Sequence, residues 1–357
     1  MTACLGNCLE GWILWSVRLK VKLQWLGAVI TGGFRGVKFG TLPEMLLAEM
    51  MIEMLKSVVA TGMDATPGCG AGRPLDHLVE LPTGSDPGEL LDYDTSAPIN
   101  PDCLSTIPAQ KNVLFHSLGS AIESSIVWDS VYFVRIAEYG YEYEQTYAFF
   151  PLLHLCMSFL SRTVLAPLVP VIGQRAVLGL SGYVINNIGF VFAAVYLYRL
   201  SVVILKDQEA AVRASILFCF NSASIFYSSI YSETLFALFS VGGLYHLISG
   251  KDVIAVLWFA LSGFSRFNGV LNAGYFCFQT MHQAYDAVFL RKRPFAVVGG
   301  ALLCICIFVP FIAFQAYGYN KLCLGHLPSD MRPWCNARVP LLYNYIQSHY
   351  WGVGFLR

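Results

Sequence analysis

The amino-acid sequence predicts an all-α polytopic membrane protein, a bundle of apolar helices joined by polar loops. Hydrophobic residues make up 56% of the 357 residues and charged residues only 13%, whereas about 25% of a soluble globular chain is charged. Long apolar runs fill the chain after residue 147, and short polar interruptions separate them. The formal net charge is zero, so the composition indicates neither nucleic acid nor another strongly charged partner.

Residues 1–112 are expected to form an atypical, partly disordered region. The run Leu23–Gly40 is too interrupted by glycines and basic residues for a good span, and Leu42–Val59 carries four charges and is expected to be a soluble or interfacial helix. Residues 66–108 are rich in Gly, Pro, Asp and Ser, a composition typical of loops. They contain Asp92-Tyr93-Asp94, formally a metal-binding Asp-x-Asp motif, but short acidic triplets are common in acidic linkers and no metal site is expected.

The stretch Trp128–Pro151, WDSVYFVRIAEYGYEYEQTYAFFP, stands directly before the apolar half of the chain. Its ionisable residues are Asp129, Arg135, Glu138, Glu142 and Glu144, and tyrosines surround them. Carboxylates and tyrosines at the mouth of a membrane span suit a polar reaction site at a bilayer surface. They equally suit an interfacial aromatic belt with incidental charges, because Tyr and Trp favour that depth.

The apolar half divides into several expected spans. Tyr147–Leu205 is long enough for two spans of about 20 residues or three short ones, with polar breaks at Ser161-Arg162 and Gln174-Arg175. The expected segments that follow are an extramembrane loop (Lys206–Arg213), a span (Ala214–Ile230), a short return (Thr234–Ile248), two short apolar pieces (Val253–Phe264 and Val270–Phe278), a last span (Phe295–Ala316) and an aromatic polar tail (317–357).

The basic cluster Arg291-Lys292-Arg293 sets an orientation through the positive-inside rule, which places it in the cytoplasm. The last span then carries the tail to the lumenal side. A lumenal Asp129 requires an odd number of crossings within 147–205. Two obvious spans do not satisfy that parity, so either three short helices are packed there or a later boundary is wrong.

Two charged residues lie between apolar pieces. Arg266, in SGFSRFNG, and Glu233, in SSIYSE, are functional candidates because ionisable groups at membrane depth face protein or water. The alternative is that Arg266 only reaches the interface from a helix end. Cys323 and Cys335 flank a polar loop, and they form a disulfide if that loop faces an oxidising lumen and stay free thiols otherwise.

Four motifs carry a family resemblance. WDSVYFVRIAEYGYEYEQTYAFFP, FNSASIFYSSIYSE, SGFSRFNG and PWC with YIQSHYWGVGF resemble, in this order, the PIG-V family, the second mannosyltransferases of glycosylphosphatidylinositol (GPI) anchor synthesis. The resemblance covers 113–357. The family's first transmembrane helix is not recognisable in 1–112 and its members continue beyond residue 357, so we expect a chain that is incomplete at both ends.

The resemblance implies a multi-pass protein of the endoplasmic reticulum with the GT-C glycosyltransferase fold and lumenal loops. It implies transfer of an α-1,6-linked mannose from dolichyl-phosphate mannose to a mannosylated GPI precursor. Neither a cofactor nor a metal is expected, and an accessory membrane subunit is a further expected partner. In GT-C enzymes the first lumenal loop carries an acidic residue needed for catalysis, and Asp129 occupies the matching position.

Inversion at the anomeric carbon requires a base for the attacking hydroxyl, and Asp129 is the residue expected to supply it. Positive charge and hydrogen-bond donors would stabilise the leaving phosphate, with Arg266 as the first candidate. The full predicted substrate-binding set is Trp128, Arg135, Glu144, Gln145, Glu233, Arg266, Asn268, His349, Tyr350 and Trp351.

Two other functions stay open at this point. A truncated, non-catalytic relative could act as a membrane scaffold for the same pathway. A multi-pass transporter would show inverted repeats and charges at mid-depth, whereas this chain shows no internal repeat and places its polar clusters at turns.

Overall fold

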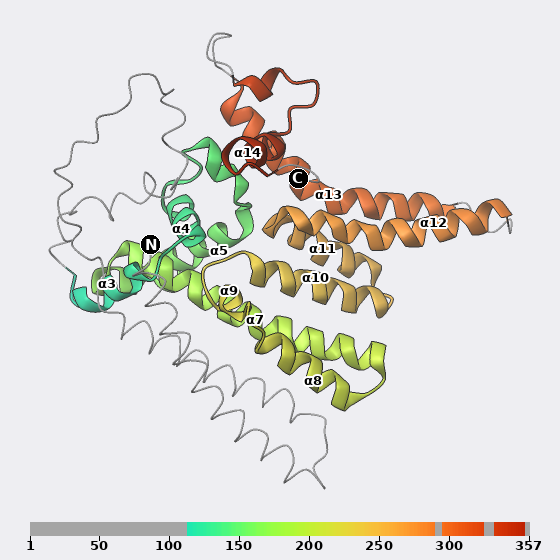
Figure 1. Ribbon diagram of the computed structural model, residues 1–357, viewed down its shortest axis with the longest axis horizontal. Coiled ribbons are helices and arrows are strands. Elements are labelled where there is room, and N and C mark those ends of the chain that lie inside the picture. Colours follow the sequence, from blue (N-terminus) through green and yellow to red (C-terminus); the bar gives the residue numbers. More distant parts are fainter. Residues whose placement is uncertain (1–112, 290–294, 325–331, 354–357) are drawn as a thin grey trace, which may run out of the picture. The chain divides into compact units, whose positions relative to one another are not determined.

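The computed structural model describes residues 113–289, 295–324 and 332–353 (Figure 1). The predictions made for residues 1–112, including Asp92-Tyr93-Asp94, and for the cluster Arg291-Lys292-Arg293 lie outside these residues. Throughout the described ranges, the regular elements are α-helices and short 3-10 helices, without a β-strand. The prediction of an all-α protein is confirmed.

Two helices are long and apolar enough to cross a membrane: α7 (Gln174–Leu205) and the stretch Val298–Leu322 of α13 (Phe295–Leu322). A third candidate is a pair of helices, α5 (Pro151–Arg162) and the segment Ala166–Ile172 that ends in α6 (Val169–Ile172), bent by 68° at the intervening break. By length and composition, the described residues therefore hold two helices that could cross a membrane, or three if the bent pair counts as one span. The last predicted span is confirmed as part of α13.

The bent pair bears on the crossing parity of residues 147–205. Phe150, directly before α5, lines the same cavity as Asp129. After the pair, a Cβ added to Gly179 in the second turn of α7 would lie 3.1 Å from the side chain of Ile126, close to Asp129 in the chain. Both ends of the pair thus lie near Asp129, which fits a re-entrant segment followed by one crossing, α7.

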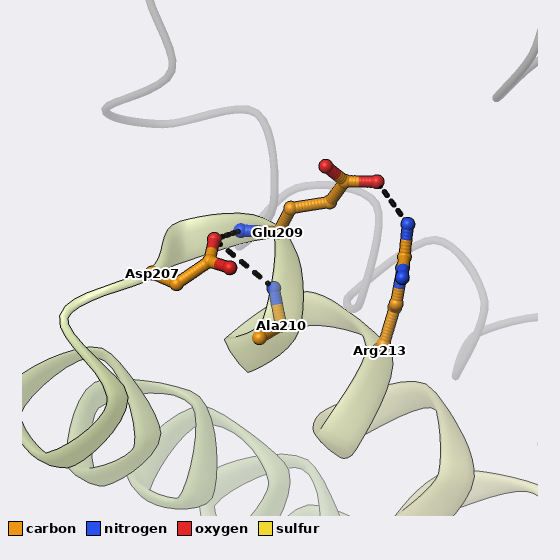
Figure 2. Close-up of polar contacts among 4 residues, drawn as sticks. All are labelled: Asp207, Glu209, Ala210 and Arg213. Atoms are coloured by element: carbon orange, nitrogen blue, oxygen red, sulfur yellow. Dashed lines mark hydrogen bonds and ion pairs between the residues drawn. The ribbon is translucent and has the colours of Figure 1, made fainter.

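The predicted loop Lys206–Arg213 is wrong as a loop, because α8 (Gln208–Cys219) begins within it, while its position outside the membrane stays a prediction. Asp207 is the N-cap of this helix: one oxygen of its carboxylate accepts from the backbone N–H groups of Glu209 at 2.9 Å and Ala210 at 3.3 Å (Figure 2). An N-cap of this kind satisfies donors that the first turn leaves without intrahelical partners. The charged run is therefore the exposed start of a helix.

The predicted span Ala214–Ile230 is also wrong, because the helix stops at the end of α8 and only one short helix, α9 (Ser224–Ser228), follows. The cause lies at Asn221, whose side-chain amide donates to Phe218 O at 2.6 Å while its carbonyl accepts from Ala223 N at 2.7 Å. Such local side-chain bonds compete with the helical ladder, and they end α8 in a turn.

Three further helices complete the bundle: α10 (Glu233–Ile248), α11 (Asp252–Ser265) and α12 (Ala273–Phe289). The short return and the first of the two apolar pieces are confirmed as α10 and α11. The second piece, Val270–Phe278, is wrong as one segment, because it is divided between the 3-10 helix η5 (Phe267–Asn272) and α12. Helix α10 packs against α7 and α11, and α13 packs against α11 and α12.

Helix α3 (His116–Ser124) packs against α7 and α6. Residues of α4 (Asp129–Tyr139), the 3-10 helix η3 (Glu144–Ala148) and α14 (Leu342–Tyr350) lie where α10 begins and α11 ends, and the 3-10 helix η7 (Pro333–Asn336) contacts η3. Cys323, directly after α13, forms a disulfide with Cys335 in η7, with the Cα atoms 5.8 Å apart. The disulfide alternative is confirmed, and the tail is an ordered part of this end of the bundle within its described residues.

Candidate active site

A cavity of about 250 Å³ lies between the starts of α4 and α10, the end of α11, η5 and α14. Its polar lining consists of Asp129, Ser232, Glu233, Ser265, Arg266, Asn268 and Gln347, and its aromatic lining of Phe133, Phe149, Phe150, Phe267, Tyr343 and Trp351. Five of the predicted site residues, Asp129, Glu233, Arg266, Asn268 and Trp351, therefore line one cavity although the chain separates the first from the last by more than half its length.

Asp129 is the first residue of α4, and the backbone before it is unusual. Trp128 has φ +53° and ψ −131°, a left-handed region that is costly for a bulky residue. The Trp128 side chain is exposed over 65% of its surface and does not line the cavity. This sharp reversal starts α4 at Asp129 and directs the chain so that the carboxylate faces the cavity.

Glu233 and Arg266 form an ion pair across the cavity. Glu233 occupies the first turn of α10, where the helix dipole favours a negative charge. Arg266 caps the end of α11 in an extended conformation. Glu233 Oε1 accepts from the guanidinium, and Glu233 Oε2 is buried without a hydrogen-bond partner among the described residues.

The reversal after Arg266 depends on a close backbone approach. A Cβ on Gly269 would lie 2.3 Å from the backbone nitrogen of Gly263 in the last turns of α11. Only glycine fits at so short a distance without displacing the backbone. The chain can thus fold back tightly and leave the Arg266 side chain and Asn268 at the cavity wall.

The pKa of Asp129 is raised above its ordinary value, first by burial and second by the negative charge of Glu233, while Arg266 lowers it in part. The carboxylate is accessible at the cavity, yet neighbouring protein atoms displace much of its hydration. A carboxylate whose pKa is raised is a stronger base than one in open solvent.

Glu144 and Tyr350 belong to a second cluster beside the cavity lining. Glu144 Oε1 accepts from Trp334 Nε1 at 2.6 Å, and Oε2 accepts from the hydroxyl of Tyr350 at 3.0 Å and lies 3.4 Å from Arg332 Nη1. Burial and the Glu144 charge raise the pKa of Tyr350 to about 12, so this hydroxyl donates at neutral pH. This latch, formed by Glu144, Trp334, Tyr350 and Arg332, joins η3 to η7 and α14.

The other predicted binding residues lie outside the cavity lining. Arg135 pairs with Glu142 at 2.8 Å and sits 4.1 Å over the ring of Tyr139. His349 is exposed and stacks on Tyr345 with the ring centroids 5.0 Å apart. Gln145 is a half-buried residue of η3. Their roles in substrate binding, like those of Trp128, Glu144 and Tyr350, stay predictions.

The sequence analysis missed several cavity residues, and two signals could have found them. Tyr343 and Gln347 were missed, and they precede the predicted Trp351 at four-residue spacing, which indicates one face of a helix. Ser232 and Ser265 directly precede the two charged candidates Glu233 and Arg266. The aromatic lining from Phe149 and Phe267 has no comparable signal in a chain so rich in phenylalanine.

The described residues contain no group of three or more His, Cys, Asp or Glu side chains that could hold a metal ion. The polar lining of the cavity holds two carboxylates and one guanidinium as its charged groups. The groups that this cavity offers to a ligand are the carboxylates of Asp129 and Glu233, the guanidinium of Arg266 and the aromatic side chains of its wall.

Comparison with known protein families shows to which family this chain belongs. The profile of the family described as Mannosyltransferase (PIG-V) matches residues 84–357. The chain belongs to this family. All the residues of the cavity and the latch fall within the matched range of the PIG-V family, and the match begins before residue 113, where the resemblance seen in the sequence starts.

Individual relatives agree with the family. The chain is 32% identical over 255 residues to GPI alpha-1,6-mannosyltransferase 2 of Cricetulus griseus and over 258 residues to that of Homo sapiens, in each case over 64% of this chain and 51% of the relative. It is 30% identical over 320 residues to GPI mannosyltransferase 2 of Chaetomium globosum, over 74% of this chain and 64% of the relative. The chain spans about half the length of the first curated relatives it matches. No solved structure matches it.

Proposed function

We propose that this protein transfers the second mannose, in α-1,6 linkage, from dolichyl-phosphate mannose to the GPI-anchor precursor. The observation that carries the proposal is the cavity that unites Asp129, Glu233 and Arg266. The names of the relatives, GPI alpha-1,6-mannosyltransferase 2 among them, support the linkage. The donor follows from the resemblance to GT-C enzymes.

The chemistry is a single displacement with inversion at the anomeric carbon. Asp129 takes the proton of the attacking hydroxyl as the new C–O bond forms, and the bond to the phosphate oxygen breaks. The phosphate leaves as an anion, so it needs no proton. Arg266 lies on the cavity wall and would stabilise the charge that develops on this leaving group.

Arg266 forms an ion pair with Glu233. A phosphate group entering the cavity would compete with Glu233 for the guanidinium, whose planar set of donors fits phosphate as well as carboxylate. Both side chains are partly exposed, 38% for Arg266 and 30% for Glu233, so this exchange does not require a deeply buried ion pair to open. Tyr343 and Trp351 offer aromatic faces for the sugar.

The setting proposed for the reaction is the lumenal side of the endoplasmic reticulum membrane, with lipid-linked substrates and an accessory membrane subunit as partners. The Cys323–Cys335 disulfide lies beside the latch and supports an oxidising compartment at this end of the bundle. The charged groups of the cavity lie at the start of α10 and the end of α11, which favours a transferase over a transporter with a mid-depth site.

Complementation tests the proposed function. Cells that lack the second GPI mannosyltransferase would receive the chain as given or a chimera in which a longer relative supplies the region that this chain does not span. Surface display of a GPI-anchored reporter is expected to return, and Asp129→Asn is expected to abolish it because the substitution keeps the shape and removes the base.

Asp207→Asn is the matched control. It replaces an aspartate outside the cavity lining, and asparagine caps helices as well as aspartate does, so rescue is expected to persist. Display restored by the Asp129→Asn protein would show that another group is the base. No rescue by either wild-type version would favour the scaffold alternative over the transferase.

A further inference from the structure

The turn between α9 and α10 has an unusual hydrogen-bond pattern. Every backbone carbonyl from Tyr227 to Ser232 accepts a hydrogen bond from a side chain. The donors, in the order of the carbonyls, are Thr234 Oγ1, Asn187 Nδ2, Asn186 Nδ2, Ser130 Oγ, Asn186 Nδ2 again and Ser265 Oγ. These donors come from α4, α7, α10 and α11.

The cost of non-helical backbone among apolar helices explains why so many donors are needed. A buried carbonyl without a partner costs several kcal/mol in a lipid-like environment. Asn186, fully buried on α7, meets this need twice, because its amide nitrogen bridges Ser229 O and Tyr231 O, the latter at 2.9 Å. One side chain of a membrane-spanning helix thus fixes two points of the turn.

The same turn is joined to each of the three charged residues of the cavity. Ser130, which donates to Ile230 O at 3.2 Å, directly follows Asp129. Ser265, which donates to Ser232 O at 3.2 Å, directly precedes Arg266.

Glu233 is itself the residue that follows the turn. The turn is therefore the common frame that sets the spacing of the base, the second carboxylate and the cation.

We propose that Asn186 is a positioning residue of the active site. By holding the carbonyls of Ser229 and Tyr231, it fixes the place of Glu233 relative to Asp129 and Arg266 in the cavity lining. Asn186 does not line the cavity. The proposal rests on the proposed transferase function, and it adds a residue that acts through the turn.

Asn186→Leu tests this role, because leucine has a similar volume and no donor. For chain purified in detergent, kcat for mannosyl transfer is expected to fall at least tenfold while KM changes less than about twofold. The acid limb of the kcat profile is expected to move to lower pH, since Glu233 would no longer raise the pKa of Asp129 as strongly. Asn186→Gln keeps an amide donor and is expected to recover part of kcat.

Ser181→Ala is the matched control on the same helix. Ser181 is fully buried and its hydroxyl donates to Val177 O within α7, without reaching the turn. Its loss is expected to leave kcat and the pH profile unchanged. A pH profile and kcat that are equally unchanged in Asn186→Leu would overturn the positioning role.

Hydrogen exchange of a peptide that covers residues 227–236 gives a readout that does not need activity. Asn186→Leu is expected to speed exchange in this peptide, and Ser181→Ala is not. If wild-type protein transfers no mannose but the exchange difference is present, the proposed function fails while the role of Asn186 in placing the turn is supported. If transfer occurs and Asn186→Leu changes neither exchange nor kcat, the positioning role fails while the function stands.

Discussion

Two carboxylates near the same end of the bundle, Glu144 and Glu233, have opposite surroundings. Both oxygens of Glu144 are occupied, one by Trp334 and the other by Tyr350 with Arg332 nearby, and its side chain is only 3% exposed. Glu233 has one oxygen on Arg266 and the other buried without a partner among the described residues, with its side chain 30% exposed.

The two carboxylates differ in how much hydrogen-bonding capacity they have left for a ligand. A saturated acceptor gains nothing from a ligand, because any new bond must replace an existing one. A carboxylate with a free oxygen and a partly exposed cation as partner can change its contacts when an anion arrives. Glu144 joins η3 to η7 and α14, whereas Glu233 and Arg266 line the cavity that we propose as the substrate site.

The largest expected effect follows from Arg266→Gln, which removes the only cation of the described cavity lining. Loss of one group that stabilises developing charge typically lowers kcat by about 10²–10³-fold, and this is the expected result for mannosyl transfer. Arg213→Gln, which breaks an exposed ion pair with Glu209 on α8, is expected to leave kcat unchanged. A loss of less than fivefold in Arg266→Gln would remove Arg266 from the mechanism.

A smaller effect is expected from Glu144→Ala, which leaves the buried Trp334 N–H without its acceptor. Such a loss costs about 2 kcal/mol of unfolding free energy, measured as a lower thermal midpoint of detergent-solubilised protein. Glu144→Gln keeps an acceptor oxygen and is expected to retain about half of that stability. A Glu144→Ala protein with unchanged stability and a large selective loss of kcat would instead show that Glu144 acts directly on substrate.

The subtlest effect concerns the pH dependence of kcat/KM. In the proposed mechanism Asp129 must be deprotonated, so activity is expected to be lost as the pH falls through its pKa, which burial and Glu233 raise and Arg266 lowers. Glu233→Gln is therefore expected to move the acid limb to lower pH, and Arg266→Gln to move the limb of its residual activity to higher pH. Glu142→Gln, which alters a carboxylate outside the cavity lining, is the control. Shifts of the same sign in both variants would exclude Asp129 as the titrating base.

The sequence predicted the helical class and the cavity charges because both depend on local patterns. Apolar runs define helices such as α10 and α13, and Asp129, Glu233 and Arg266 stand out as charges at the edges of such runs. The break after α8 was missed because the side-chain bonds of Asn221 that end the helix are not visible in hydropathy.

The contacts of Glu144 could not be predicted from the sequence for a different reason. Its partner Trp334 is 190 residues away along the chain, and a single sequence carries no sign of that contact. A tyrosine-rich segment near the membrane made substrate binding a reasonable interpretation. Only the fold shows that both oxygens of this carboxylate are already occupied, so a local pattern can find a charged group without showing what it is for.

Helix α7 connects the active site to the lipid bilayer around the protein. The same helix that is long and apolar enough to cross the bilayer holds the turn before Glu233 through Asn186. A spanning helix can tilt when the hydrocarbon thickness of the bilayer changes. A tilt of α7 would move the Asn186 amide relative to the turn that it holds. We therefore expect the turnover of this protein to depend on the acyl-chain length of the bilayer around it, even when the concentration of its lipid substrates is unchanged.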